Sequence, residues 1–278
     1  MSNVTPADIK RLRELTAAGM MDCKKALEEA AGDFDRAVEI LRIKGAKDVG
    51  KRAERTASNG LVAVHLDGTA TGALLELNCE TDFVAKTEGF QALAAQVVAF
   101  IVAAKPTDVP SLLGAEIEPG KTVQQLLDEA NASMGEKIEI RRFTLIEAPY
   151  LASYLHKSDP SLPPSTGVLV ALSTANAEIG KDVAQQIAAM APKYLTRDDV
   201  PAEIVADERR IAEETARSEG KPDAAISKIV DGRVAGFFKD FALVEQPFVK
   251  DNKKTIKQVL ADAGVEVRAF ARYKVGQS

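Results

Sequence analysis

Residues Thr81–Lys86 read TDFVAK and stand between two segments of different periodicity. The apolar run Ala73–Cys79 before them predicts a strand, and Gly89–Ala104 after them predicts a helix. TDFVAK therefore forms a strand-to-helix connection, and connections lie at the surface and carry function more often than the elements they join. The acid Asp82 and the large aromatic Phe83 are neighbours in this connection.

Two interpretations of this pair follow from the pattern alone. In the first, Phe83 is a wedge that enters another molecule and Asp82 acts beside it. In the second, Asp82 caps the following turn and Phe83 folds back into the core of this chain, because large apolar side chains are usually buried. The pattern alone favours the second interpretation.

Composition limits the classes of protein that fit. The chain has 278 residues, of which 46% are hydrophobic and 5% aromatic, with no tryptophan. This length supports two or three folding units, and abundant alanine favours helix-rich packing. The net charge of −5 argues against a nucleic-acid binder held by phosphate contacts. A basic run interleaved with acids is typical of a solvated helix face or a linker, and it comprises Lys44, Lys47, Lys51, Arg52 and Arg55.

The two cysteines, Cys23 and Cys79, lie far apart and do not form a metal-binding spacing. Isolated thiols without a signal peptide fit the reducing cytosol, so we expect a cytoplasmic protein. No apolar run approaches the roughly 18 residues that span a bilayer. We therefore expect no membrane segment, no metal and no cofactor.

The first 45 residues predict three short helices. Thr5 is a candidate N-cap, and Ile9, Leu12 and Leu15 fall on one helical face. Gly19 is predicted to end this helix. The second helix is predicted over residues 21–31, and the third begins after Asp33 and ends at Gly45. Three helices of this length make a small head with a marginal core, and a charged linker is expected over residues 46–57.

Met20 and Met21 stand side by side at the start of the second predicted helix. At least one of them must point away from the head, and an exposed methionine suits an adaptable contact surface. A methionine that fills a gap in the core is the alternative for one of the pair.

The rest of the chain predicts a mixed fold of helices and antiparallel strands, the α+β class. Strands are expected over residues 60–66 and 72–78, with the hairpin signal Asp67-Gly68 between them. Lys105-Pro106 ends the long helix that follows. A short helix over residues 123–130 and a strand over 138–146 complete a first subdomain, residues 58–148.

The second half echoes this plan. Residues 121–127, KTVQQLL, are repeated as KTIKQVL over residues 254–260, and each copy precedes a predicted strand. The run Gly167–Leu172 resembles residues 60–65, and a helix over residues 182–191 corresponds to the long helix of the first half. We infer a duplicated unit whose second copy spans residues 149–195 and 234–278. Chance similarity between amphipathic segments is the alternative.

The insertion in the second copy, residues 196–233, predicts a helical hairpin. Helices are expected over residues 201–218 and 222–238, joined at Glu219-Gly220-Lys221. The apolar faces are expected to comprise Ile204, Ile211 and Thr215 on the first helix and Ile226, Ile229 and Val230 on the second. Two helices bury little surface alone, so the hairpin packs on another chain or is a mobile arm.

Several blocks resemble, in order and spacing, the bacterial elongation factor Ts family. They are residues 16–27, TAAGMMDCKKAL; residues 78–86, NCETDFVAK; and the later GKP, GR and QPFV motifs at residues 220–222, 232–233 and 246–249. This family comprises nucleotide exchange factors for the translational GTPase elongation factor Tu. The resemblance implies an α+β fold with a ubiquitin-associated-like head, a duplicated core and an inserted helical hairpin.

The resemblance also implies a function. The chain would bind elongation factor Tu–GDP, speed release of GDP and let GTP replace it, by protein contact rather than as an enzyme. The residues implied to displace Mg²⁺ from the GTPase are Thr81, Asp82, Phe83 and Val84. Those implied to contact a helix of the GTPase domain are Leu12, Met20 and Met21. No direct nucleic-acid contact is implied, and a homodimer or a 2:2 complex through the hairpin is a further expectation.

The sequence gives less support to nucleotide binding or catalysis by this chain itself. Residues 114–122, GAEIEPGKT, look like a phosphate loop, but Ala115 stands where the motif needs glycine and Pro119 removes an amide, so a helix-capping turn is expected. His65 is expected on a strand and His156 in a loop, without a neighbouring nucleophile. The alternative function is a ubiquitin-associated-like adaptor or dimerising scaffold that is indifferent to nucleotide.

Overall fold

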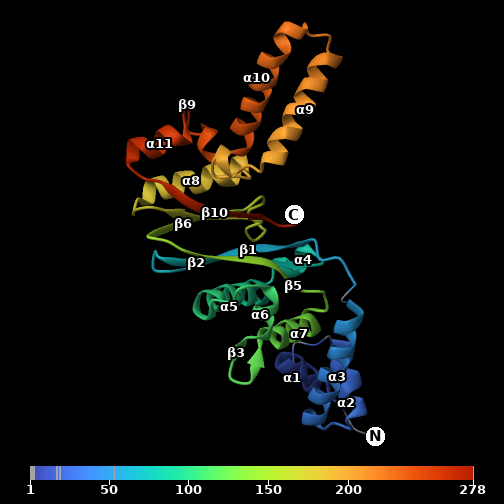
Figure 1. Ribbon diagram of the computed structural model, residues 1–278. Helices are drawn as coiled ribbons and strands as arrows, with labels where there is room; N and C mark the ends of the chain where they lie inside the picture. The colour runs from blue at the N-terminus through green and yellow to red at the C-terminus, as the bar shows by residue number, and fades with distance from the viewer. Residues whose placement is uncertain (1–3, 17, 19, 53, 278) are drawn as a thin grey trace.

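Two three-stranded antiparallel sheets lie against each other in the middle of the molecule, and helices cover their outer faces (Figure 1). The structure is a computed structural model that describes residues 4–16, 18, 20–52 and 54–277. The N-terminal helices lie at one end of the molecule and a long helical hairpin projects at the other (Figure 1). The α+β class predicted from the sequence is confirmed.

The head consists of α1 (Pro6–Thr16), α2 (Met20–Glu29) and α3 (Phe34–Arg52). Thr5 caps α1 as predicted, because the amide of Asp8 donates to its hydroxyl at 3.2 Å. The third helix does not end at Gly45 but continues to Arg52, so part of the predicted linker is helical. This helix packs against α7 of the core, and this tertiary contact offsets the low helix propensity of its two glycines, Gly45 and Gly50. Gly19, the predicted end of α1, lies outside the described residues.

The first sheet has the order β1-β2-β5, formed by Asn59–Asp67, Thr71–Cys79 and Glu139–Glu147. Its outer face is covered by α5 (Glu88–Ala104) and α7 (Val123–Met134), with α6 (Val109–Gly114) and the short strands β3 (Glu116–Glu118) and β4 (Lys121–Thr122) between them. Alternate side chains of β2, such as Leu75 and Leu77, pack against Phe90 and Ile101 of α5.

The second sheet has the order β10-β7-β6, formed by Val267–Lys274, Thr166–Leu172 and Tyr150–His156. Helices α8 (Ala177–Met190) and α11 (Ile256–Ala263) cover it, and the short strands β8 (Pro247–Phe248) and β9 (Asp251–Thr255) precede α11. The sequence analysis missed β6, so His156 ends a strand rather than lying in a loop.

Strand β6 also changes the match between the two halves. With β6 present, β7 is the second strand of its hairpin and the middle strand of its sheet, as β2 is in the first sheet. The prediction that Gly167–Leu172 corresponds to residues 60–65 of β1 is therefore wrong. By its place in the hairpin and in the sheet, β7 matches β2. Each last strand follows a helix with a Thr–Gln capping box, Thr122 with Gln125 and Thr255 with Gln258.

The two sheets meet through side chains that point away from the covering helices. Val62, Leu74, Leu151 and Leu169 form one buried cluster between them. Gly167 is needed for this close approach, because a Cβ there would lie 2.4 Å from Cγ1 of Val62. Both faces of the middle strands β2 and β7 are therefore buried, which explains why these two strands are mostly apolar along their whole length.

The hairpin consists of α9 (Ala202–Ser218) and α10 (Asp223–Phe241). Small residues form its seam on α9, where Ala212 and Ala216 are buried. Ile211, predicted on the apolar face, is 48% exposed instead. The helices approach along the alanines because small side chains allow closer packing.

Among the described helices, none is long and apolar enough to cross a membrane.

Candidate functional site

The connection after β2 forms a single helical turn, α4 (Asp82–Ala85). Thr81 has extended backbone angles and its hydroxyl accepts from the amide of Val84 at 3.4 Å, so Thr81 is the N-cap. A second cap follows immediately, because the hydroxyl of Thr87 accepts from the amide of Phe90 at the start of α5. Two capping threonines thus confine the turn between a buried strand and a buried helix.

This turn presents Phe83 to solvent. The Phe83 side chain is 76% exposed, the largest value among the exposed large apolar residues of the described chain. Its neighbours face inward, since Ala85 is buried and Val84 packs against the core of the first sheet. The interpretation in which Phe83 belongs to the core of this chain is therefore wrong, and Thr81 rather than Asp82 caps the turn.

Asp82 forms an ion pair with Lys86 across one turn, with 2.8 Å between Oδ2 and Nζ. The hydrogen bond and the charge of Lys86 lower the pKa of the Asp82 carboxyl, so it is an anion at neutral pH. The same ammonium lies 5.5 Å from the centre of the Phe83 ring. An anion, a cation and an aromatic face are thus grouped at one exposed point of the surface.

The other predicted contact lies on the head. Met20 and Met21, at the start of α2, are 59% and 62% exposed. The alternative of a core methionine therefore applies to neither of them. Leu12 is different, because it is fully buried among Cys23, Leu27 and their neighbours. Leu12 offers no surface to a partner in this structure and belongs to the core of the head.

Comparison with known proteins identifies the family of this chain. A family profile described as "Elongation factor TS" matches residues 80–277. The chain belongs to the elongation factor Ts family. Elongation factor Ts of Thermobifida fusca (strain YX) is 66% identical over 278 residues and is covered completely, as is this chain. Elongation factor Ts of Acidothermus cellulolyticus is 61% identical over 277 residues, again with 100% of both chains covered. That of Streptomyces avermitilis is 58% identical over 277 residues.

In this member of the elongation factor Ts family, the QPFV motif at residues 246–249 places a second apolar side chain at the surface. Gln246 is fully buried, and its side-chain oxygen accepts from Nε2 of Gln186 at 3.1 Å. Oε1 of Gln186 in turn accepts from the amide of Val249 at 2.9 Å, which fixes the turn between β8 and β9. Val249 is 48% exposed at this turn. The sequence analysis quoted the motif but did not find the buried partner, Gln186, because sixty residues separate the two glutamines.

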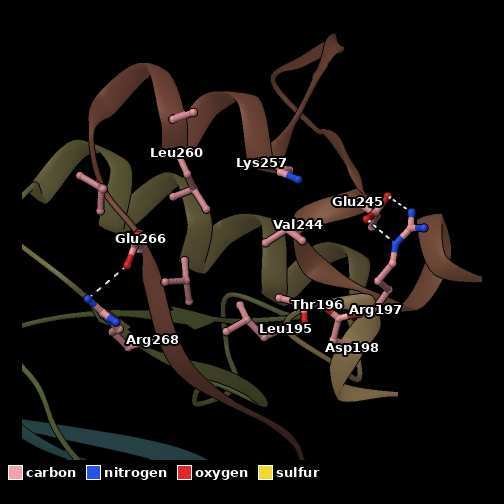
Figure 2. A pocket seen from close by; sticks show the side chains of 13 residues that line it. Leu195, Thr196, Arg197, Asp198, Val244, Glu245, Lys257, Leu260, Glu266 and Arg268 are labelled. Atoms are coloured by element: carbon pink, nitrogen blue, oxygen red, sulfur yellow. Dashed lines mark hydrogen bonds and ion pairs between the residues drawn. The ribbon is translucent and has the colours of Figure 1, made fainter. Parts of the chain in front are cut away.

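A groove of about 940 Å³ lies between α11 and the segments that flank the base of the hairpin (Figure 2). Leu195, Val244 and Leu260 contribute apolar lining. The charges at its edge pair with each other, since Arg197 binds Glu245 at 2.9 Å and Arg268 binds Glu266 at 3.1 Å (Figure 2). The groove therefore combines an apolar lining with largely neutralised charges. The sequence analysis did not predict it, because its lining residues come from three separate stretches of the chain.

Proposed function

We propose that this chain is a guanine nucleotide exchange factor for elongation factor Tu, which acts by protein contact. Membership of the elongation factor Ts family supports the partner. The observation that carries the mechanism is Phe83, a large aromatic side chain that is 76% exposed on the turn capped by Thr81. A folded chain usually buries such a side chain, so its exposure favours use as a wedge.

The wedge would act on the metal of the partner. Mg²⁺ requires near-ideal octahedral geometry with ligands at about 2.0–2.1 Å, so small displacements of GTPase elements weaken its hold. Phe83 entering an apolar slot would shift those elements, and the Asp82 carboxylate would disturb the waters or side chains that bind the metal. Thr81 and Val84 hold the turn from which both side chains project.

The effect of this chain on GDP affinity and the effect of GDP on the affinity for this chain must be equal. Whatever factor the chain removes from the affinity for GDP, GDP must remove from the affinity for this chain. A thousandfold weakening corresponds to about 4 kcal/mol of coupling free energy, which a few buried contacts supply. The exposed pair Met20 and Met21 is proposed as the second contact, since flexible methionines adapt to a partner surface.

We also propose that the core arose by duplication and that the head is a ubiquitin-associated-like domain that ends with α3. The capping boxes support the duplication, because Gln125 and Gln258 accept from their capping threonine amides at the same distance, 2.8 Å. The common position of β2 and β7 in their sheets supports it as well.

Release of a fluorescent GDP analogue from elongation factor Tu tests the proposed function. The rate constant should rise with the concentration of this chain, and Phe83→Ala should remove most of the rise. A capture experiment separates the adaptor alternative, because an exchange factor retains nucleotide-free GTPase in preference to the GDP form. No acceleration by the wild-type chain, with capture that ignores nucleotide, would overturn the proposal.

A further inference from the structure

The turn that carries Phe83 is held by a carboxylate from a distant part of the chain. Glu136 follows α7, and its Oε2 accepts from the backbone amides of Glu80 at 3.1 Å and Thr81 at 3.0 Å. Its Oε1 accepts from the hydroxyl of Thr81 at 2.5 Å. One carboxylate therefore satisfies three donors at the N-cap of α4. Hydrogen bonds to an ionised acceptor are about twice as strong as neutral ones.

Glu136 itself stands on a rigid turn. Gly135 ends α7 in the left-handed region with φ 76°, where glycine carries no steric penalty. The buried side chain of Asn131 then ties the far side of the turn to the helix, because its Oδ1 accepts from the amide of Ile138 at 2.5 Å. The backbone on both sides of Glu136 is thus held in place, and the three hydrogen bonds restrain the carboxylate itself.

The side chain of Glu80 makes a reciprocal contact with the turn that carries Glu136. Its Oε1 accepts from the amide of Lys137 at 2.7 Å and from Nη1 of Arg55 at 3.3 Å. The ammonium of Lys137 donates to the carbonyl oxygen of Arg55 at 3.0 Å, and the side-chain amide of Asn59 donates to the carbonyl oxygen of Glu80 at 2.7 Å. Three stretches, residues 55–59, 80–81 and 136–137, are therefore joined at one place. We name this set the Glu80–Glu136 clamp.

The clamp matters because it holds the start of α4, whereas the rest of the turn is held by the buried Ala85, by Val84 and by Thr87. A helix of four residues is not stable by itself, since one turn does not repay the cost of nucleation. Phe83 is mostly exposed, and the ammonium of Lys86 on the same turn lies 5.5 Å from the centre of its ring. The direction of Phe83 therefore depends on the backbone of the turn, whose N-terminal side, at Glu80 and Thr81, is held by Glu136.

We propose that Glu136 is a positioning residue for nucleotide exchange. With Glu80 it fixes the orientation in which Phe83 meets the partner, and the bond from Arg55 to Glu80 ties that orientation to the segment that follows the head. This inference rests on the proposed exchange function. The clamp lies at the margin of the fold, with side-chain exposures of 22% for Glu80 and 51% for Arg55, so its loss should free the turn without unfolding the core.

Glu136→Gln tests the proposal at constant side-chain size. The amide leaves one acceptor oxygen for three donors and places an NH₂ group against the others. Glu139→Gln is the matched control, because Glu139 lies nearby and its carboxylate pairs with Lys137 at 2.9 Å. Glu136→Asp keeps the charge but shortens the reach by one methylene, so it should give an intermediate result.

Two readouts are needed, and the first does not depend on the partner. Hydrogen–deuterium exchange of the amides at residues 80–84 should become faster in Glu136→Gln than in Glu139→Gln, while the amides of β2 keep their protection. Because the chain contains no tryptophan, Phe83→Trp adds a single tryptophan reporter, which is excited selectively over the four tyrosines. Its anisotropy should fall when Glu136→Gln is combined with it.

The second readout is the stimulated release of GDP from elongation factor Tu. Glu136→Gln should lower the apparent second-order rate constant by about tenfold, the factor given by loss of one charge-assisted hydrogen bond. The melting temperature should stay near that of Glu139→Gln. Unchanged amide exchange, or faster amide exchange with unaltered GDP release, would overturn the proposal. If the wild-type chain itself releases no GDP, the exchange function fails and the first readout still tests the clamp.

Discussion

Phe83 and Phe90 are the same residue type seven positions apart, and their environments are opposite. Phe90 is fully buried at the start of α5, whereas Phe83 is 76% exposed. Truncating a buried phenylalanine to alanine costs about 3–5 kcal/mol, because contacts are lost and a cavity remains. Truncating an exposed one removes little from the folded chain. The pair therefore separates stability from function within one segment.

Phe83→Ala should leave the melting temperature close to that of the wild type and reduce stimulated GDP release. Phe90→Ala should lower the melting temperature strongly, while exchange per folded molecule changes less. Calorimetry and GDP release on the same purified samples check both statements. A large drop in melting temperature for Phe83→Ala, with exchange per folded molecule intact, would remove the wedge mechanism.

Cys79 gives a pH dependence of stability. Burial raises the pKa of its thiol from the ordinary 9.0 to about 12, and the Glu136 carboxylate adds to the rise. The protonated thiol also donates to the carbonyl oxygen of Thr81 at 3.1 Å. Because the folded pKa lies above the unfolded one, this contribution is complete below about pH 9 and is lost as the pH rises toward 12.

Urea unfolding of the wild type and of Cys79→Ala at about pH 8 and pH 10 should reveal this contribution. The wild type should lose more stability than the variant between the two conditions, by on the order of 1 kcal/mol. Ionisation of lysines and tyrosines is common to both chains and cancels in the difference. Equal losses in the two chains would contradict the raised pKa.

Some site residues could be predicted from the sequence and others could not. The difference depends on whether the pattern lies within one short stretch of the chain. The TDFV turn was found because a strand run, an acid and an aromatic stand in one short stretch. Leu12 was assigned to the partner through the family resemblance although it is buried, whereas its place on one helical face with Ile9 and Leu15 is what a core position gives. Glu136 was not found at all, because its contact to Thr81 spans 55 residues of sequence.

At the scale of elements, capped helices were the most predictable. Thr5, Thr122 and Thr255 accept from backbone amides at helix starts, a signal contained within four residues. Strand β6 was missed because its sequence, YLASYLH, mixes small and polar residues, and its pairing with β7 supplies the order that its own pattern lacks. The end of α3 was misplaced because packing against α7 carries the helix through Gly45.

The contact proposed for α2 makes a prediction at this scale. Met20→Ala combined with Met21→Ala should leave the head folded, since alanine is the better helix former and both side chains are exposed. Affinity for nucleotide-free elongation factor Tu should fall by about tenfold, or roughly 1.4 kcal/mol. Glu29→Ala, exposed at the other end of α2, is the control. Calorimetric titration that gives the same affinity for all three chains would exclude α2 from the interface.

At the scale of the whole molecule, the hairpin stands apart from the stacked sheets (Figure 1). Its apolar seam comprises Ala212, Ile226, Val230 and Val234 and forms a cluster separate from the sheet cores. Its base belongs to the core instead, because Arg197 lies over the Phe238 ring at 5.0 Å and Gln246 donates to the carbonyl oxygen of Asp240. A cut intended to remove the arm alone must therefore leave residues 196–202 and 235–246 in place.

Replacing residues 203–234 with a Gly/Ser loop of about four to six residues should preserve the fold. Packed helix axes lie about 8–10 Å apart, and such a loop spans about 11–13 Å, so the base is not strained. If Phe83 in the first half carries exchange, the shortened chain should stimulate GDP release within about twofold of the full chain. Adding Phe83→Ala to the shortened chain should remove that activity by the same factor as in the full chain, because distant changes with no shared contacts act additively. A collapse of exchange in the shortened chain, with its circular dichroism and melting intact, would place a necessary contact on the hairpin and limit the wedge to one part of the mechanism.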